Sequence, residues 1–160
     1  MPNLTCSQNV RTILQETAWL EPEHFLLARK ISFLEKTNHE NIWQIYLNTL
    51  ALLGLEVWLQ KRLRNKVITR DISRISTAGN LKVDEFKFCT IATENLLSEV
   101  IKIPRIDVAH FYVLIEVLEE EEQVVIRGFL SHNQLIKSSN KSKLPISDGF
   151  YQIPLSLFDM

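Results

Sequence analysis

The sequence is poor in glycine, in cysteine and in net charge, and each shortage excludes a class of protein. Its four glycines are scattered over 160 residues, so it has no glycine-rich loop to cradle phosphate groups. Its two cysteines are too few for a disulfide framework, which favours a reducing, cytoplasmic location. A net charge of -1 is typical neither of a polyanion-binding protein nor of an acidic, solvating chain.

The sequence also lacks a segment that we expect to enter a membrane. The opening residues, MPNLTCSQNVRT, contain no apolar core of a secretory signal. The run from Leu47 to Leu59 is interrupted by Asn48, Thr49 and Glu56, and it is shorter than the ~20 residues that span a bilayer as a helix. We therefore expect a cytoplasmic protein without membrane contact.

What the chain does contain is enough apolar residues for a core, with 46% hydrophobic and 23% charged residues. No internal repeat or linker divides it. The patterns predict that residues 1–65 are mainly helical and residues 66–160 mainly β-strand. We therefore predict a single α+β domain over residues 1–160, in which an N-terminal helical hairpin packs on a mostly antiparallel sheet or a partly open barrel.

The longest helical pattern covers residues 41–63 and is apolar on two sides. At 100° per residue, tryptophan and small residues, including Gly54 and Trp58, share one face, and leucines share the opposite face. A glycine inside a helix costs about 1 kcal/mol relative to alanine, which favours a close approach by another backbone, from the same chain or from a second copy. Gly54 and Trp58 are therefore candidate interface residues.

Shorter helical patterns precede this one. A helix is predicted over residues 22–36, because Pro22 suits the first helical position, and its inward stripe ends at Leu34. A further short helix is predicted within residues 1–20.

The second half of the chain begins with weak strand patterns. Residues 64–76 are predicted to form a strand or a bent loop, and residues 77–80 a turn. The alternation over residues 81–93 changes face near Asp84 and Glu85, which indicates a bulge or two separate strands. Residues 94–100 are predicted to form one or two helical turns.

The clearest strand pattern is a hairpin formed by residues 110–118 and 123–130, with Glu119–Glu122 at its exposed tip. Pairing Leu118 with Gln123 leaves one face without a polar side chain. That face carries Phe111, Val113, Ile115, Val117, Val124, Ile126, Gly128 and Leu130. We expect this face to be buried and the opposite face to be half covered at most.

The end of the chain is predicted to be less ordered. Residues 131–149 are polar, with a mobile loop at residues 137–143. Residues 150–157 form a last strand, placed at a sheet edge because Pro154 lacks a backbone donor.

One short motif suggests catalysis. Glu85-Phe86-Lys87 matches half of a metal-dependent nuclease core, in which a carboxylate binds the metal and a lysine polarises the attacking water. Such a site needs a second acid from a neighbouring strand, and Asp71 or Asp84 would have to supply it. Three-residue patterns arise by chance in charged strands, so a solvated strand face is the competing interpretation.

A basic stretch follows the long helix, with no acid between Val57 and Arg70. It consists of Lys61, Arg62, Arg64, Lys66 and Arg70. Such a stretch suits contact with the phosphates of a nucleic acid. Cations at the end of a helix also complement its dipole without any ligand, and the near-zero net charge favours this second interpretation.

The four histidines, His24, His39, His110 and His132, lack metal-ligand spacing, so the sequence predicts no metal and no cofactor. His110 and His132 lie at the outer end of the predicted hairpin, where they can approach each other. Cys89 lies in a strand pattern and is expected to be a small buried hydrophobe rather than a nucleophile.

Five stretches resemble a cyanobacterial family catalogued as domain of unknown function 1822. They are WLEPEHFLLARKIS (19–32), YLNTLALLGLEVWLQKRL (46–63), NLKVDEFKFCTIATENLLSEV (80–100), AHFYVLIEVLEEEEQVVIRGFLSHNQL (109–135) and IPLSLFD (153–159). The resemblance implies a cyanobacterial, cytoplasmic protein of unassigned activity, and it carries over no functional residue.

These patterns contain no acid–base or ligand cluster. The leading hypothesis is therefore a non-enzymatic protein-interaction or regulatory module whose partner is a protein, with a second copy of the chain in a homodimer as one option. The alternatives are a metal-dependent nuclease using Glu85 and Lys87, and a nucleic-acid-binding module using residues 61–70.

Overall fold

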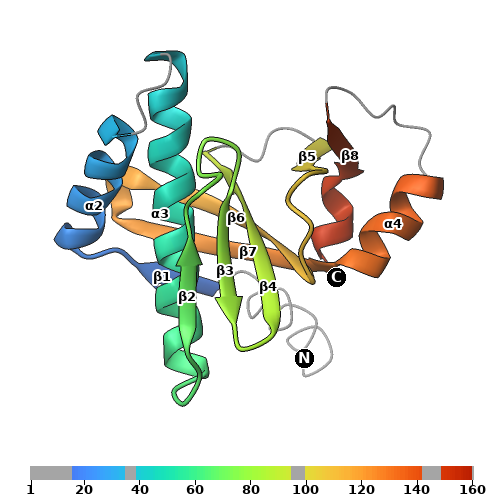
Figure 1. Cartoon of the computed structure of the whole chain (residues 1–160), viewed down its shortest axis with the longest axis horizontal. Helices are drawn as coiled ribbons and strands as arrows, with labels where there is room; N and C mark the ends of the chain where they lie inside the picture. Colours follow the sequence, from blue (N-terminus) through green and yellow to red (C-terminus); the bar gives the residue numbers. More distant parts are fainter. Residues whose placement is uncertain (1–15, 35–38, 95–99, 142–148, 160) are drawn as a thin grey trace, which may run out of the picture.

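A computed structural model of the chain describes residues 16–34, 39–94, 100–141 and 149–159. One long helix lies across a six-stranded sheet that curls partway around it, and a small two-stranded sheet lies on the other side (Figure 1). The expected α+β class, with a helical hairpin packed on a mostly antiparallel sheet, is confirmed.

The strands form two sheets. The large sheet contains β1 (Glu16–Trp19), β2 (Ile68–Asp71), β3 (Gly79–Val83), β4 (Phe86–Thr93), β6 (Phe111–Leu118) and β7 (Gln123–Ser131), in the order β1-β7-β6-β4-β3-β2. All its pairings are antiparallel except that of β4 with β6. The small sheet pairs β5 (Val100–Pro104) with β8 (Phe150–Pro154), so Pro154 lies on an edge strand as predicted.

The helices described by the structure lie on both sides of the large sheet. They are α2 (Pro22–Leu34), α3 (His39–Arg62), α4 (His132–Lys141) and the short 3-10 helices η1 (Glu119–Glu121) and η2 (Leu155–Asp159). Helices α2 and α3 match the two predicted N-terminal helices to within a few residues, whereas α4 lies in a segment that was predicted to be poorly ordered.

Helix α3 is the centre of the fold, and its middle is covered on all sides. Every residue from Ile45 to Leu55 is buried. Helix α2 packs on one side, and all six strands of the large sheet contact the helix on another. By length and composition, Asn41–Arg62 is apolar enough to cross a membrane, but 67% of its most apolar window is buried within the chain, as in a core helix.

Two polar residues within this buried run have partners. The Asn48 side chain donates to the carbonyl oxygen of Ile75 at 2.8 Å and accepts from Gln44 at 2.8 Å. The Thr49 hydroxyl donates to the Ile45 carbonyl at 2.7 Å, within the helix. Burying an unpaired amide costs a few kcal/mol, so Asn48 fixes the helix against the segment between β2 and β3.

Gly54 lies where α3 crosses the sheet. A Cβ atom at this position would lie 2.2 Å from Cγ2 of Val124 on β7, which is shorter than any tolerable contact. The close approach expected at Gly54 is therefore made within the chain. One turn further on, Trp58 packs against Phe129, with ring centroids 5.5 Å apart.

The β6–β7 hairpin has the predicted register near its tip but not along its whole length. Leu118 pairs with Gln123 and Val117 with Val124, as expected. A bulge then shifts the register, because Leu114 pairs with Gly128 while Ile115 pairs with Ile126. The prediction that Gly128 and Leu130 share the face of Val124 and Ile126 is therefore wrong. A Cβ at Gly128 would lie 1.9 Å from the carbonyl oxygen of Phe158 in η2, so no larger residue fits there.

The second face of the hairpin is covered more fully than expected. Tyr112, Leu114 and Leu130 are buried in a second core, against β5, β8 and η2. The small sheet therefore acts as a second layer, which the alternation pattern of the hairpin did not indicate.

Two predictions for the N-terminal segment are corrected. A short helix was predicted within residues 1–20, but residues 16–19 of that stretch form strand β1. This strand pairs with β7, which would otherwise be an open edge of the sheet. The rest of the predicted helix, in residues 1–15, lies outside the described residues. Leu34, predicted to face inward, is 65% exposed, because Ala28, Ile31 and Ser32 form the buried face of α2.

Three predictions for the second half are also resolved. The change of face near Asp84 is a hairpin turn between β3 and β4, so the alternative of two strands is correct. The turn predicted at residues 77–80 ends earlier, because Gly79 already pairs with Thr90. Of the helical turns predicted for 94–100, residues 95–99 lie outside the described part of the chain.

We expect Gly54→Ala to lower the free energy of unfolding by about 1–3 kcal/mol, the usual cost of overpacking, even though alanine is the better helix former. Val124→Ala removes the methyl groups that obstruct the new Cβ. In urea unfolding, the decrease in the free energy of unfolding of the double variant should be smaller than the sum of the two single decreases by at least ~0.5 kcal/mol. Strictly additive losses would contradict the contact.

Candidate functional site

The residues of the nuclease motif do not form a metal site in the described part of the chain. Glu85 lies exposed in the β3–β4 turn, and neighbouring Asp84 is ion-paired with Lys66 at 3.0 Å. Asp71 accepts hydrogen bonds from the hydroxyl and the amide of Ser73, which lower the pKa of its carboxyl group. No group of three or more histidine, cysteine, aspartate or glutamate side chains is placed to hold a metal among the described residues.

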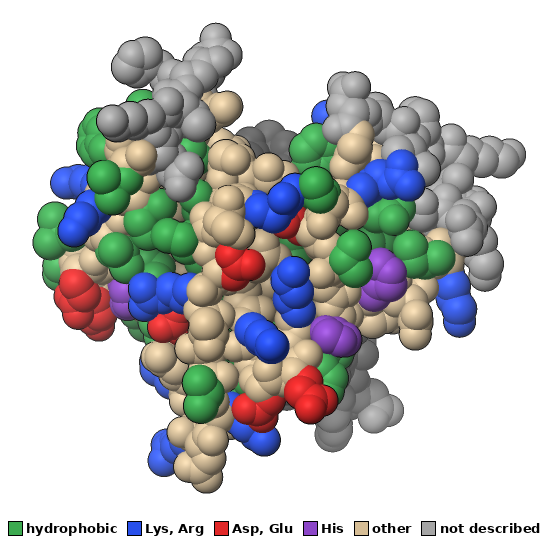
Figure 2. Space-filling model, viewed as in Figure 1, with side chains coloured by type: hydrophobic (Ala, Val, Ile, Leu, Met, Phe, Trp, Pro, Cys, Tyr) green, Lys and Arg blue, Asp and Glu red, His purple; other side chains and the backbone are tan. Residues whose placement is uncertain are grey.

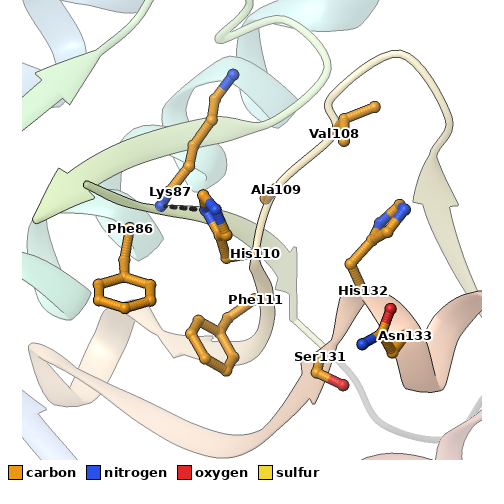
Figure 3. Close-up of a pocket in the computed structure, with 9 residues that line it drawn as sticks. All are labelled: Phe86, Lys87, Val108, Ala109, His110, Phe111, Ser131, His132 and Asn133. Carbon is orange, nitrogen blue, oxygen red and sulfur yellow. Dashed lines mark hydrogen bonds between the residues drawn. The ribbon is translucent and has the colours of Figure 1, made fainter.

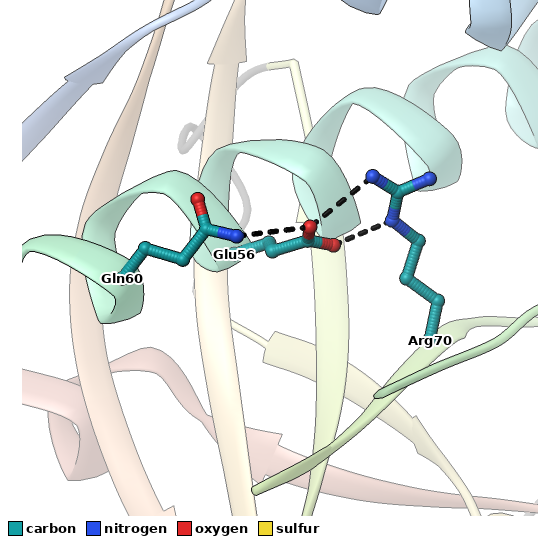
Figure 4. A network of polar contacts seen from close by, with 3 residues as sticks. All are labelled: Glu56, Gln60 and Arg70. Atoms are coloured by element: carbon teal, nitrogen blue, oxygen red, sulfur yellow. Dashed lines mark hydrogen bonds and ion pairs between the residues drawn. The ribbon is translucent and has the colours of Figure 1, made fainter. Parts of the chain in front are cut away.

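Three of the five basic candidates are bound to acids of the same chain. Arg70 holds Glu56 through two hydrogen bonds of 2.5 and 3.1 Å, and Gln60 donates to the same carboxylate (Figure 4). Arg62 pairs with Glu16 and lies over the ring of Trp58. These ion pairs leave less positive charge for a nucleic acid.

The two remaining basic candidates, Lys61 and Arg64, are exposed near the end of α3. Lys66, although paired, is exposed as well, and Val67 beside it is 72% exposed. We call the surface formed by Lys61, Arg64, Lys66 and Val67 the basic end.

A pocket of about 480 Å³ opens where β4, β6, β7 and α4 meet. Its lining consists of Phe86, Lys87, Val108, Ala109, His110, Phe111, Ser131, His132 and Asn133 (Figure 3). We call it the histidine pocket, since the two histidines that were expected to approach each other both line it. Histidine and apolar side chains lie side by side on this face of the molecule (Figure 2).

The loop before β6 forms one wall of the histidine pocket and is fastened by hydrogen bonds on both sides. The amide of His110 donates to the Lys87 carbonyl at 2.9 Å, and the amide of His132 donates to the His110 carbonyl at 3.0 Å. The amide of Ala109 donates to the Tyr112 hydroxyl at 3.3 Å. The wall is therefore fixed by β4, β6 and α4 before any ligand arrives.

The hydrogen bonds of the two imidazoles determine which nitrogen carries the proton. Nδ1 of His110 accepts the amide of Lys87 at 2.9 Å, so the ring proton lies on Nε2. The Tyr112 oxygen accepts the Ala109 amide, and we assign its own proton to Nδ1 of His132, 3.0 Å away. Both histidines thus keep Nε2–H as a donor.

Helix α4 begins at the pocket with a reciprocal cap. The Ser131 hydroxyl accepts the amide of Gln134 at 3.2 Å, and the Gln134 side chain accepts the amide of Ser131 at 2.9 Å. This capping box, together with the burial of Leu135, explains why a polar segment forms a helix instead of the predicted loop. It also fixes His132 and Asn133 in the first turn. Residues 142–148 of the predicted loop lie outside the described residues.

A buried aspartate anchors the same loop from behind. Asp107 is only 1% exposed, and its Oδ1 lies 2.9 Å from Nε of Arg74 and 3.5 Å from Nδ2 of Asn80. Its Oδ2 has no hydrogen-bond partner among the described residues. Burial raises the pKa of the Asp107 carboxyl group, although Arg74 and Asn80 act in the opposite direction.

Cys89 lies behind this anchor and is fully buried, as predicted. Its burial raises the pKa of the thiol, which keeps the sulfur protonated and unreactive.

A second hollow lies between α2, α3 and the hairpin tip. It has two parts. One part has a volume of about 460 Å³ and is lined by Arg29, Ser32, Phe33, Ile42, Trp43, Tyr46 and Glu119. The other has a volume of about 340 Å³ and is lined by Trp43, Glu94, Val117, Leu118, Glu119, Glu120 and Glu121. Because Trp43 and Glu119 line both, we treat them as one surface, the Trp43 groove. It is apolar at one end and acidic at the other.

The sequence reasoning missed most of both sites. It singled out the hairpin tip and the two histidines, but not Trp43 or the anchor Asp107. The Ser131-x-x-Gln134 spacing was a readable signal for α4 and hence for one wall of the histidine pocket. Asp107 and Arg74 lie far apart in the sequence, so no local spacing indicates their contact.

The buried anchor predicts a pH-dependent stability. Burial raises the pKa of Asp107 in the folded protein above its unfolded value of about 3.9. The protonated side chain therefore contributes stability that is fully present below pH ~3.9 and is lost as the pH rises through the folded pKa. Asp107→Asn cannot titrate. In urea unfolding at several pH values, the free energy of unfolding of the wild type relative to Asp107→Asn should therefore fall as pH rises from ~4. A difference that stays constant with pH would contradict the assignment.

Comparison with known proteins gives a family and no activity. No curated protein and no solved structure matches the chain. The family model described as "Protein of unknown function (DUF1822)" matches residues 19–160, nearly the whole of the chain. The protein thus belongs to the DUF1822 family, as the five matching stretches predicted.

Proposed function

We propose that the protein is a non-enzymatic interaction module that forms a homodimer by docking the basic end of one copy in the Trp43 groove of the other. The proposal rests on two surfaces of the same molecule. The Trp43 groove is an exposed apolar surface bordered by acids, and the basic end is an exposed surface of opposite charge. Gly54 and Trp58, the interface candidates from the sequence, pack within the chain, so the contact falls on the two ends of α3 instead.

The apolar part of the Trp43 groove supports a protein partner. Phe33 is 71% exposed and Trp43 is 47% exposed, and both line the groove. Apolar side chains gather over the α2–α3 hairpin in Figure 2. Contiguous exposed apolar surface of this kind is typical of interaction sites, and tryptophan is a frequent hot-spot residue.

The position of Trp43 supports a preformed contact. Its indole N–H donates to Glu94 at 2.8 Å, and its ring lies 5.3 Å from that of Tyr46. A tryptophan fixed on both sides loses little side-chain entropy when a partner binds.

Charge determines which partner the groove fits. Glu119, Glu120 and Glu121 line its acidic end, so a complementary segment combines an apolar side chain with lysine or arginine. The basic end of the same chain has this composition, because Val67, Lys61 and Arg64 are all exposed there. A second copy is therefore the occupant that we propose.

The symmetry follows from the positions of the two surfaces. The Trp43 groove lies at the start of α3, and the basic end lies at its finish. Two copies with antiparallel α3 helices place each basic end in the other copy's groove. The two contacts are then identical, which closes the assembly as a dimer with two-fold symmetry.

Light scattering measures the mass directly. At micromolar concentration the wild type should have twice the mass of the chain, and Trp43→Ala should be a monomer because the groove loses its apolar anchor. Trp19→Ala, at a similarly exposed tryptophan outside the groove, is the matched control and should remain a dimer. A monomeric wild type would overturn the proposal.

A charge swap tests the pairing itself. We expect Glu120→Lys/Glu121→Lys and Lys61→Glu/Arg64→Glu each to be monomeric, with the dissociation constant raised by about tenfold or more, because like charges then face each other. Mixing the two variants should restore a dimer, since both contacts regain opposite charges. A mixture that remains monomeric would contradict the antiparallel arrangement.

A further inference from the structure

We propose that the histidine pocket binds a small organic anion, in which an apolar body carries a carboxylate or a similar group. The site is separate from the Trp43 groove and shares no residue with it. It therefore goes beyond self-association, and either proposal can fail without the other.

The pocket carries several hydrogen-bond donors and no acidic side chain. Nε2–H of His110, and that of His132 in the assigned tautomer, have no hydrogen-bond partner among the described residues. Lys87 also lines the pocket and carries an ammonium group; its backbone nitrogen lies against the His110 ring, and its side chain extends away from that ring (Figure 3). None of the nine lining residues is an acid. Ser131 and Asn133 can donate as well as accept, so imidazole donors together with a lysine in the lining complement an anion.

The surrounding acids do not cancel this preference. Asp107 lies behind the loop rather than in the lining, and it is already paired with Arg74 at 2.9 Å. Asp84 and Glu85 lie in the β3–β4 turn, outside the lining, and Asp84 is paired with Lys66. Among the nine lining residues the only acidic or basic side chain besides the histidines is therefore that of Lys87, which also interacts electrostatically with Asp71 and Asp107.

The walls require an apolar body on the ligand. Phe86 is 53% exposed although its ring packs against His110 and Phe111, at centroid distances of 5.5 and 6.2 Å. Val108, on the opposite wall, is also largely exposed. A bare inorganic ion would leave these side chains in water, whereas an aromatic or branched body would cover them.

The pocket is preformed, so binding requires little ordering. Hydrogen bonds fix the loop before β6 to β4 and α4, and the capping box fixes the first turn of α4. Its volume of about 480 Å³ lies within the usual range for small-molecule sites.

Benzoate is the probe, and NMR of the histidine rings is the readout. In a titration, the Cε1–Hε1 signals of His110 and His132 should move and saturate, while those of His24 and His39 stay fixed. Benzyl alcohol lacks the charge and acetate lacks the apolar body, so each should bind about tenfold or more weakly than benzoate.

Two lysine variants then test whether Lys87 supplies the positive charge that binds benzoate. Lys87→Gln should weaken benzoate binding by about tenfold, the loss of one charge-assisted contact, whereas Lys30→Gln on α2 should leave it unchanged. The monomeric Trp43→Ala variant should bind benzoate as the wild type does. The proposal is overturned if no histidine signal moves, if all four move alike, if either analogue matches benzoate, or if Lys87→Gln binds as tightly as the wild type.

Discussion

The packing of α3 against β7 at Gly54 is the constraint on which the rest of the structure depends. Only a residue without a Cβ lets the helix approach Val124 this closely. That approach allows all six strands of the large sheet to pack on the helix at once, with α2 on its other side, so that every residue from Ile45 to Leu55 is buried. The helix therefore offers partners only its two ends, one beside the acidic hairpin tip and the other basic.

The large sheet separates the two sites that we propose. One face of β6 and β7 packs on α3, while the other supports the small sheet and η2, with Gly128 directly beneath Phe158. The histidine pocket lies at the ends of these strands remote from the hairpin tip, where β7 continues into α4. Its loop is anchored through Asp107 to Arg74, which lies between β2 and β3. The same segment is held to α3 by the hydrogen bond from Asn48 to the Ile75 carbonyl, so both the sheet and the long helix support the pocket.

The parts that could be predicted from the sequence are those with strong periodicity: the two long helices and the β6–β7 hairpin near its tip. The bulge between Leu114 and Ile115 could not be predicted, because the alternation pattern of the hairpin gives no sign of it. The close approach of Phe158 to Gly128 could not be predicted either, because it joins residues of different layers. Strand β1 is only four residues long and is determined by the edge of β7. Of the sites, the acidic tip and the approach of the two histidines were readable. The Trp43 groove and the Asp107 anchor were not, because each joins segments that are distant in the sequence.

The central claim is that the middle of α3 is covered by its own chain, whereas its two ends are covered by a second copy. Hydrogen–deuterium exchange at low and high protein concentration tests this claim most directly. We predict that amides from Ile45 to Leu55 exchange slowly at both concentrations. Protection around Trp43, Glu119–Glu121 and Arg64–Val67 should rise with concentration. If protection rises instead in the middle of α3, or nowhere, the claim is contradicted.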